Sequence, residues 1–104
     1  MAVYVAHYET ACMTRQQLER LVAEAAAASS GACASRQCFA SMTGGHLVWI
    51  FEAPDRASLE DWLVRLRMAN HQWLMRVDYE GNGGAVKATG ISNLAICRFG
   101  ELEI

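Results

Sequence analysis

Apolar runs and amphipathic segments alternate along the first 80 residues of this chain. Apolar and β-branched residues predict strands over residues 3–8, 34–42, 46–52 and 72–79. A first helical stripe lies between the first two strands, at Leu18, Leu21, Val22 and Ala25. A second stripe follows the third strand, at Leu59, Trp62, Leu63 and Leu66. Because both stripes have the spacing of an amphipathic helix, the predicted order is strand, helix, strand, strand, helix, strand.

Local signals indicate where these elements begin and end. Thr14, followed by Gln17 three residues later, has the pattern of a capping box at the start of the first helix. The segment Thr43-Gly44-Gly45 predicts a hairpin turn between the second and third strands. Pro54 has no N–H to donate and ends the third strand, and Asp55 is a suitable N-cap for the second helix.

This order of elements matches the split βαβ, or ferredoxin-like, plan, which is an α+β fold. Right-handed crossovers then place the four strands in an antiparallel sheet of order 4-1-3-2. Two helices cover only one face of such a sheet, yet the strands are apolar on both faces, most clearly over residues 46–52. We therefore expect a second copy of the chain to cover the other face. The result would be a homodimer, a dimeric α/β barrel with a space between its two sheets.

The last quarter of the chain has a different pattern. Residues 80–90 are rich in glycine and predict a turn-rich linker, without the strand-loop-helix context of a phosphate loop. Residues 93–99 alternate apolar side chains and predict an extra C-terminal strand that adds to a sheet edge, of the same subunit or of its partner. The sequence thus predicts one domain over residues 1–104, with a core over 1–80 and a linker and strand over 81–104.

Composition and charge narrow the range of partners. The chain has 104 residues, of which 53% are apolar and 19% charged, and a net charge of −2. Its nine Lys and Arg residues are scattered, which argues against nucleic acid or an anionic membrane as a partner. The apolar runs are too short to span a bilayer. The first residues lack the basic and apolar regions of a signal peptide, so we expect a cytoplasmic protein.

The cysteines are expected to be reduced and structural. They are Cys12, Cys33, Cys38 and Cys97. An even number permits disulfides, but the expected compartment and an apolar core favour free thiols. No Cys-x-x-Cys pair is present, and the spacing of Cys33 and Cys38 matches no zinc module.

The predicted sheet brings all three histidines to one edge. The end of the first strand neighbours the starts of the third and fourth strands, and these places carry His7, His46 and His71. Imidazole binds nickel, copper and zinc, and Glu9 and Cys12 lie near enough to complete a coordination shell. A histidine could instead act as a general base. Each histidine could also be an ordinary, partly exposed residue at a strand end, and the sequence leaves these alternatives open.

Polar residues inside apolar strands form a second candidate site. Glu52, Arg76 and Asp78 would orient a ligand, or act as acid and base, if they face the space between two sheets. Residues that could line the same space are Trp49, Trp73, Phe51, Met42 and Met75. The alternatives are that the charges pair with one another or with solvent at strand ends, and that the large apolar residues belong to the core or to a dimer contact.

Three short motifs resemble a family of small uncharacterised bacterial domains that includes nickel-binding members. They are the opening Met-Ala-Val-Tyr-Val-Ala-His-Tyr, the pair Met13-Thr14, and Phe51-Glu52-Ala53-Pro54-Asp55. The resemblance covers about residues 1–80. It implies a ferredoxin-like fold that dimerises into an α/β barrel, and nickel as a candidate metal.

The chain departs from that family at several positions. Family members often have Glu-Arg in place of His7-Tyr8, a glycine in place of Cys12, and a Gly-Leu-Pro segment that is absent here around Asn70. The wider group of dimeric α/β barrels includes small monooxygenases, isomerases and dehalogenases, so the fold alone does not select a function.

The sequence supports two functional hypotheses. The first is a binding protein, for a small apolar molecule or for a divalent transition metal such as nickel or zinc. The second is a small cofactor-independent enzyme, an isomerase or a monooxygenase, that uses His7, Glu52 or Arg76 inside the barrel. Because the sequence contains no strong catalytic signature, binding is favoured.

Overall fold

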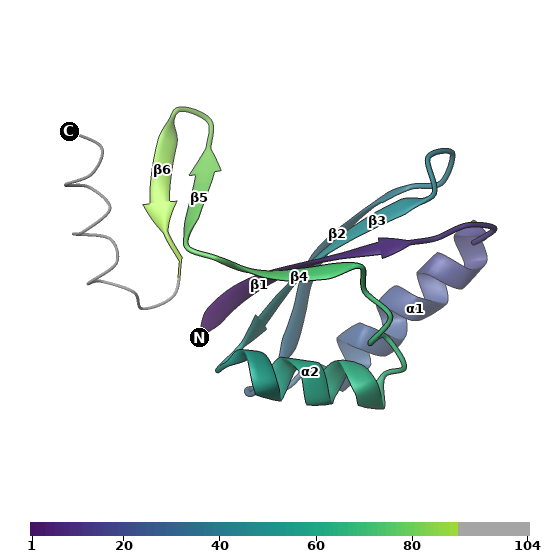
Figure 1. The fold of residues 1–104 in the computed structure, drawn as a ribbon, viewed down its shortest axis with the longest axis horizontal. Helices are drawn as coiled ribbons and strands as arrows, with labels where there is room; N and C mark the ends of the chain where they lie inside the picture. Colours follow the sequence, from purple (N-terminus) through teal and green to yellow (C-terminus); the bar gives the residue numbers. More distant parts are fainter. Residues whose placement is uncertain (90–104) are drawn as a thin grey trace.

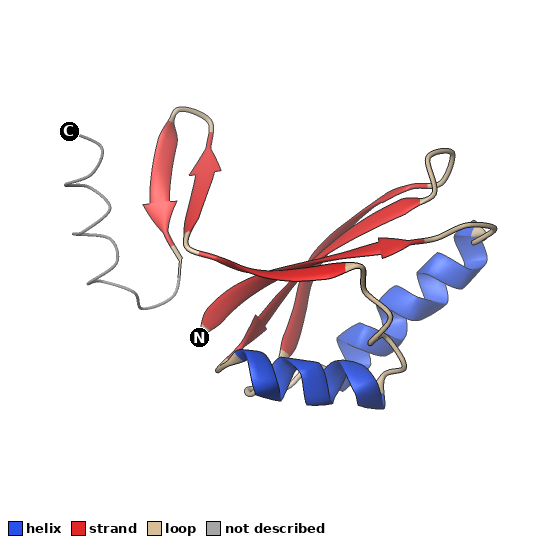
Figure 2. Ribbon diagram, in the orientation of Figure 1, coloured by secondary structure: helices blue, strands red, loops and turns tan. Residues whose placement is uncertain are grey.

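The computed structural model describes residues 1–89, in which a sheet and two helices form two layers (Figure 1, Figure 2). The sheet contains β1 (Ala2–Glu9), β2 (Ala34–Ser41), β3 (His46–Ala53) and β4 (Trp73–Val77). The helices are α1 (Arg15–Ala28) and α2 (Arg56–Arg65). The antiparallel strand order β2-β3-β1-β4 is the predicted order, taken from the opposite edge. The predicted α+β fold is therefore confirmed and fits the ferredoxin-like plan, while the dimeric barrel stays a prediction.

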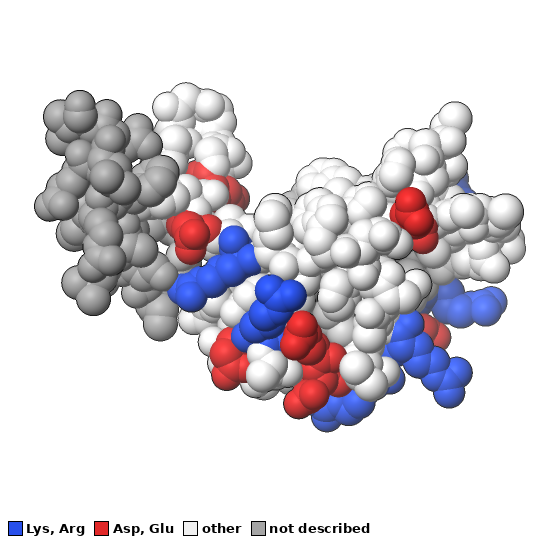
Figure 3. Space-filling view, in the orientation of Figure 1, with Lys and Arg blue, Asp and Glu red and all other residues white. Residues whose placement is uncertain are grey.

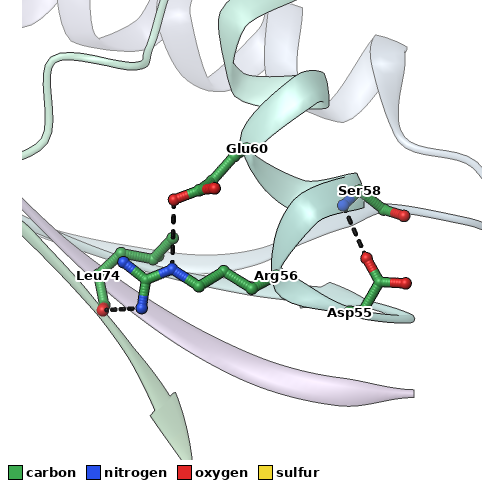
Figure 4. Close-up of polar contacts among 5 residues, drawn as sticks. All are labelled: Asp55, Arg56, Ser58, Glu60 and Leu74. Carbon is green, nitrogen blue, oxygen red and sulfur yellow. Dashed lines mark hydrogen bonds and ion pairs between the residues drawn. The ribbon is translucent and has the colours of Figure 1, made fainter.

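Each helix begins after a residue whose side chain caps it. At α1, Oγ1 of Thr14 accepts a hydrogen bond from the backbone N–H of Gln17 (3.1 Å), and Oε1 of Gln17 accepts one from the backbone N–H of Thr14 (2.8 Å). This is the predicted capping box. At α2, the carboxylate of Asp55 accepts a hydrogen bond from the backbone N–H of Ser58 (2.7 Å; Figure 4). In the described part of the chain, neither helix is long and apolar enough to cross a membrane.

Arg56 fixes α2 against the edge strand β4 (Figure 4). Its Nε donates a hydrogen bond to the carboxylate of Glu60 one turn along the helix (3.2 Å), and its Nη1 donates to the backbone carbonyl of Leu74 (3.2 Å). Hydrogen bonds from a charged donor are stronger than neutral ones. The guanidinium therefore helps to hold the helix at a set position over the sheet.

The core lies between the sheet and the helices. Its largest fully buried side chains are Trp49, Phe51, Leu47, Leu59 and Leu63. Phe51 stacks on Trp49 (ring centroids 5.5 Å apart) and meets the edge of Trp62 (5.7 Å). Only Ala25 of α1 is fully buried, so this small side chain lets the helix approach the sheet closely. The two helices therefore cover one face of the sheet.

The opposite face of the sheet is covered by no helix of the described residues (Figure 1). Side chains alternate along a strand, so Val3, Val5 and His7 of β1 point away from the core that Tyr4, Ala6 and Tyr8 join. Their cross-strand partners on β3 and β4 point the same way, and they are Val48, Ile50, Glu52, Trp73, Met75 and Val77. Phe39 of β2 lies opposite Val48 and continues the surface. We call the surface formed by these residues and His46 the open face.

The segment predicted to be a linker instead forms a β-hairpin, β5 (Tyr79–Asn82) and β6 (Ala85–Ala88). Gly83 in its turn has a φ of +60°, and two central glycines are a typical signal for a tight hairpin. The backbone N–H of Thr89 donates to the carbonyl of Asp78 (2.9 Å) and closes the base of the hairpin. The hairpin stands on the side of the sheet away from the helices (Figure 1). The strand predicted over residues 93–99 lies outside the described residues.

Candidate functional site

Large apolar side chains on the open face remain exposed. Phe39 is 56% exposed, Met75 54% and Trp73 41%. In Figure 3 the charged side chains gather mainly along the helix layer, whereas the outline above the sheet is mostly uncharged and hollowed. Burying such surface contributes roughly 25 cal/mol per Å². The open face is therefore the strongest candidate for a binding surface in the described part of the chain.

Two histidines meet at one end of the open face. Nε2 of His7 lies 3.0 Å from Nδ1 of His46, within hydrogen-bonding distance. The ring of His7 also stacks on His46 (centroids 5.1 Å apart) and on Trp73 (5.4 Å). The three rings thus form a row across β3, β1 and β4. Because one nitrogen must donate the proton and the other must accept it, at least one of the two imidazoles is neutral when this bond is formed.

The third histidine lies apart from this pair. His71 meets the edge of Tyr8 (ring centroids 6.2 Å apart), and Tyr8 is buried in the core on the helix side. The strand that was predicted over residues 72–79 begins at Trp73 in the structure, so His71 lies before it. Trp73, and not His71, is the cross-strand neighbour of His7. The expected convergence of His7, His46 and His71 is therefore not present. No group of three or more His, Cys, Asp or Glu residues within residues 1–89 is placed to hold a metal ion.

The other end of the open face carries an ion pair. Nε of Arg36 lies 3.4 Å from the carboxylate of Glu52. Arg36 occupies an irregularity in the pairing of β2 with β3, between Ser35 and Gln37. A hollow of about 140 Å³ opens beside this pair, at the base of the hairpin. It is lined by Val3, Val5, Arg36, Gln37, Ile50, Val77, Tyr79 and Glu80.

These two polar ends are separated by an apolar middle. His7 and Val3 are four residues apart on β1, and Val3 pairs with Glu52. At a rise of about 3.3 Å per residue, the histidine end and the carboxylate end lie roughly 13 Å apart along the strand. That length accommodates a small molecule with an apolar body and polar groups at its ends.

The other predicted ligand-binding residues lie elsewhere. Trp49 faces the helices, is fully buried, and donates its Nε1–H to Oγ of Ser35 (2.8 Å). Arg76 pairs with Tyr4 on the helix side of the sheet and lies 3.8 Å from the carboxylate of Asp78. Trp49 and Arg76 therefore lie on the helix side of the sheet and not on the open face, because side chains alternate between the two faces along a strand. Of the five predicted residues, Glu52 and Trp73 lie on the open face.

Several open-face residues were missed in the sequence. They are Val5, Phe39, Val48 and Ile50, together with Arg36, which pairs with Glu52 at one end of this face. Strict alternation from His7 would have placed Val5 on the same face as the histidine. Arg36 gave no such signal, because it occupies the irregular position of β2.

The described cysteines are free thiols. Cys12 is exposed, Cys33 is buried and Cys38 is partly buried, and Cys97 lies outside the described residues. Burial raises the pKa of Cys33 and of Cys38, so each thiol is less ionised at neutral pH than an exposed cysteine. Neither of these two thiols has the character of an activated nucleophile.

Comparison with known proteins finds no match among family models, curated proteins or solved structures. The family resemblance and its nickel therefore stay predictions. Function is inferred below from the geometry of the open face.

Proposed function

We propose that this protein is a homodimeric binding protein that holds a small, flat apolar molecule between the open faces of two copies. The observation that carries the proposal is the exposure of Phe39, Trp73 and Met75 on a sheet face without a helix cover. Contiguous exposed apolar patches on a protein mark surfaces that bind a ligand or another protein chain. A second copy of the chain presents the same face and would cover it.

The row of rings formed by Trp73, His7 and His46 supports a flat ligand. Aromatic rings stack in offset or edge arrangements, and a planar molecule could extend the row. The histidine pair at one end and the Glu52–Arg36 pair at the other supply the few polar groups that orient a ligand in an apolar pocket.

The His7–His46 contact also supports a second candidate, catalysis without a cofactor. A neutral imidazole on an apolar surface is able to take a proton from a bound substrate, and its neighbour would stabilise the charge that forms. A small molecule that copurifies with the protein would separate the two candidates. Chemical change of that molecule with wild-type protein, but not with His7→Gln, would favour the enzyme.

The dimer is tested by sedimentation equilibrium of wild type, Met75→Glu and Val64→Glu. Met75 lies on the open face and is 54% exposed, whereas Val64 lies on α2 and is 60% exposed. We expect wild type and Val64→Glu to be dimers at micromolar concentration, and Met75→Glu to be a monomer because it places charge in the interface. A monomeric wild type, or a dimer that survives Met75→Glu, would contradict the proposal.

Ligand binding is tested with the flat aromatic dye anilinonaphthalene sulfonate. We expect saturable binding to wild type, weakened about twofold to thirteenfold by Trp73→Ala, because an aromatic contact contributes about 0.5–1.5 kcal/mol. Val22→Ala, which removes an exposed apolar side chain from α1, is the control and should bind the dye as wild type does. Equal binding to wild type and Trp73→Ala would place the dye elsewhere and count against the open face.

A further inference from the structure

The β5–β6 hairpin has an apolar face and a polar face. Residues that pair across two antiparallel strands point to the same side, and side chains alternate along each strand. The residues of the apolar face are Tyr79, Gly81, Val86 and Ala88. The residues of the polar face are Glu80, Asn82, Ala85 and Lys87. The hairpin is therefore amphipathic, as a strand pair is when it packs one face on another body.

The apolar face is uncovered at its outer end. Val86 is 73% exposed, more than any other exposed large apolar side chain of residues 1–89. Tyr79 and Glu80 line the hollow beside the open face at the base of the hairpin, and beyond this base β5 and β6 pack mainly on each other. A two-stranded hairpin by itself is at best marginally stable in water. A further contact on the apolar face would therefore stabilise it.

The position of the hairpin indicates what makes that contact. It stands at the end of the open face that carries Val3 and Val77, on the side of the sheet away from the helices (Figure 1). Each of its strands has four residues, which span roughly 13 Å at a rise of about 3.3 Å per residue. Two packed sheets lie about 10 Å apart. A second sheet on the open face would therefore lie beside the hairpin, within its height.

We propose that the β5–β6 hairpin is a dimerisation arm, whose apolar face packs on the second copy that covers the open face. This inference rests on the proposed function for the presence of that second copy, and it adds a contact outside the two open faces. Because a homodimer has two-fold symmetry, each copy contributes one arm and the contact occurs twice. The polar face stays in water, with Glu80 opposite Lys87.

The chain offers a direct test of the arm, because Lys87 is its only lysine. A lysine-specific protease therefore cuts the full chain only in the hairpin, and it does so when this segment opens locally. Met75→Glu, measured at the same protein concentrations, is the monomer control. We expect wild-type dimer to be cut at least about tenfold more slowly than Met75→Glu, because an arm held by the partner opens less often. Mass spectrometry of the two fragments measures the rate.

The outcomes separate this inference from the proposed function. Equal cleavage rates in a wild-type dimer and in monomeric Met75→Glu would mean that the hairpin is free in the dimer. The arm would then be overturned and the proposed function would stand. Slow cleavage in both proteins would mean that the chain itself covers the hairpin, which also overturns the arm. A monomeric wild type in sedimentation equilibrium would overturn both the arm and the proposed dimer.

Two matched substitutions test which face of the hairpin makes the contact. Val86→Asp and Ala85→Asp place the same charged residue at adjacent positions of β6, one on each face. We expect Val86→Asp to weaken dimerisation at least about tenfold in sedimentation equilibrium, because the contact buries the valine side chain. Ala85→Asp should dimerise as wild type does. An equal effect of the two substitutions, or a larger effect of Ala85→Asp, would overturn the packing of the apolar face on the second copy.

Discussion

His7 and His46 face one another across the two central strands, with Nε2 of His7 3.0 Å from Nδ1 of His46. The two residues are 39 positions apart in sequence and meet because His7 pairs with Val48 while Glu9 pairs with His46. The side chains therefore lie diagonally on one face of the sheet. His71 lies next to Tyr8 instead, so the pair has only two imidazoles.

Nickel or zinc binding stays a prediction, and the geometry specifies which histidines it would use. A metal bound by this chain should depend on the two histidines that lie together. We expect His7→Ala and His46→Ala each to weaken nickel binding at least about tenfold, the range seen when a group near a metal is lost, and His71→Ala to leave it unchanged. Calorimetric titration of the three variants with nickel measures this. A loss of binding in His71→Ala equal to that in His7→Ala would show that the metal uses another arrangement.

Replacement of Cys12 by glycine should stabilise the protein. Cys12 lies in the loop between β1 and α1 with a φ of +67°, a conformation that is strained for any side chain and ordinary for glycine. We expect Cys12→Gly to raise the free energy of unfolding by about 0.5–1 kcal/mol, measured by urea denaturation. Cys12→Ser keeps the strain and is the control, with an expected change near zero. A less stable Cys12→Gly protein would mean that the cysteine side chain makes a favourable contact that outweighs the strain.

The sequence predicted the elements well because hydrophobic periodicity records which side chains are buried. The stripe of Leu59, Trp62 and Leu63 became the buried face of α2, and Thr14 and Asp55 became N-caps. The prediction failed where a shift of one residue along a strand decides on which face of the sheet a side chain lies. Trp49 and Arg76 face the helices because strand residues alternate faces, and an apolar run on both faces hides that alternation.

The pocket of about 200 Å³ on the helix side of the sheet lay beyond sequence reasoning for a different reason. Thr10 and Arg67 are far apart in the chain, and only the packing of two loops against the end of β1 brings them to one cavity. The positive φ of Arg67 has no sequence signal either, because the signal for such a helix end is a glycine. The β5–β6 hairpin was missed although Gly83 and Gly84 were visible, since glycine is common in both linkers and tight turns.

The Asp55 cap should make the acid stability of the protein depend on one carboxylate. The hydrogen bond from the backbone N–H of Ser58 lowers the pKa of Asp55 below its ordinary value. Because the pKa is lower in the folded state, the contribution is present above the pKa of the unfolded chain and is lost as pH falls through the folded pKa. The affected window is therefore below about pH 4.

Urea denaturation of Asp55→Asn between about pH 5 and pH 2 measures this effect. Asparagine keeps an oxygen that accepts the Ser58 N–H but cannot ionise, so the fall in stability with acid should be shallower than in wild type. Asp61→Asn, at an exposed position of the same helix without a capping role, is the control and should follow wild type more closely. Parallel curves for Asp55→Asn and wild type would contradict the assignment.

Trp73 should report association through the open face by its fluorescence. It is 41% exposed, whereas Trp49 is fully buried and Trp62 is 6% exposed, so Trp73 is the only tryptophan of the chain open to a quencher. In a dimer formed through the open face, the second copy would cover it. We expect acrylamide to quench the Trp73 fluorescence little at high protein concentration and strongly after dilution below the dissociation constant of the dimer.

Trp73→Phe should remove the concentration-dependent part of the quenching, because only buried tryptophans remain. In Met75→Glu, acrylamide should quench the Trp73 fluorescence strongly at every protein concentration, because the glutamate blocks association. Quenching of wild type that is strong and independent of concentration would mean that the open face stays uncovered, and covering by a second copy would then be excluded.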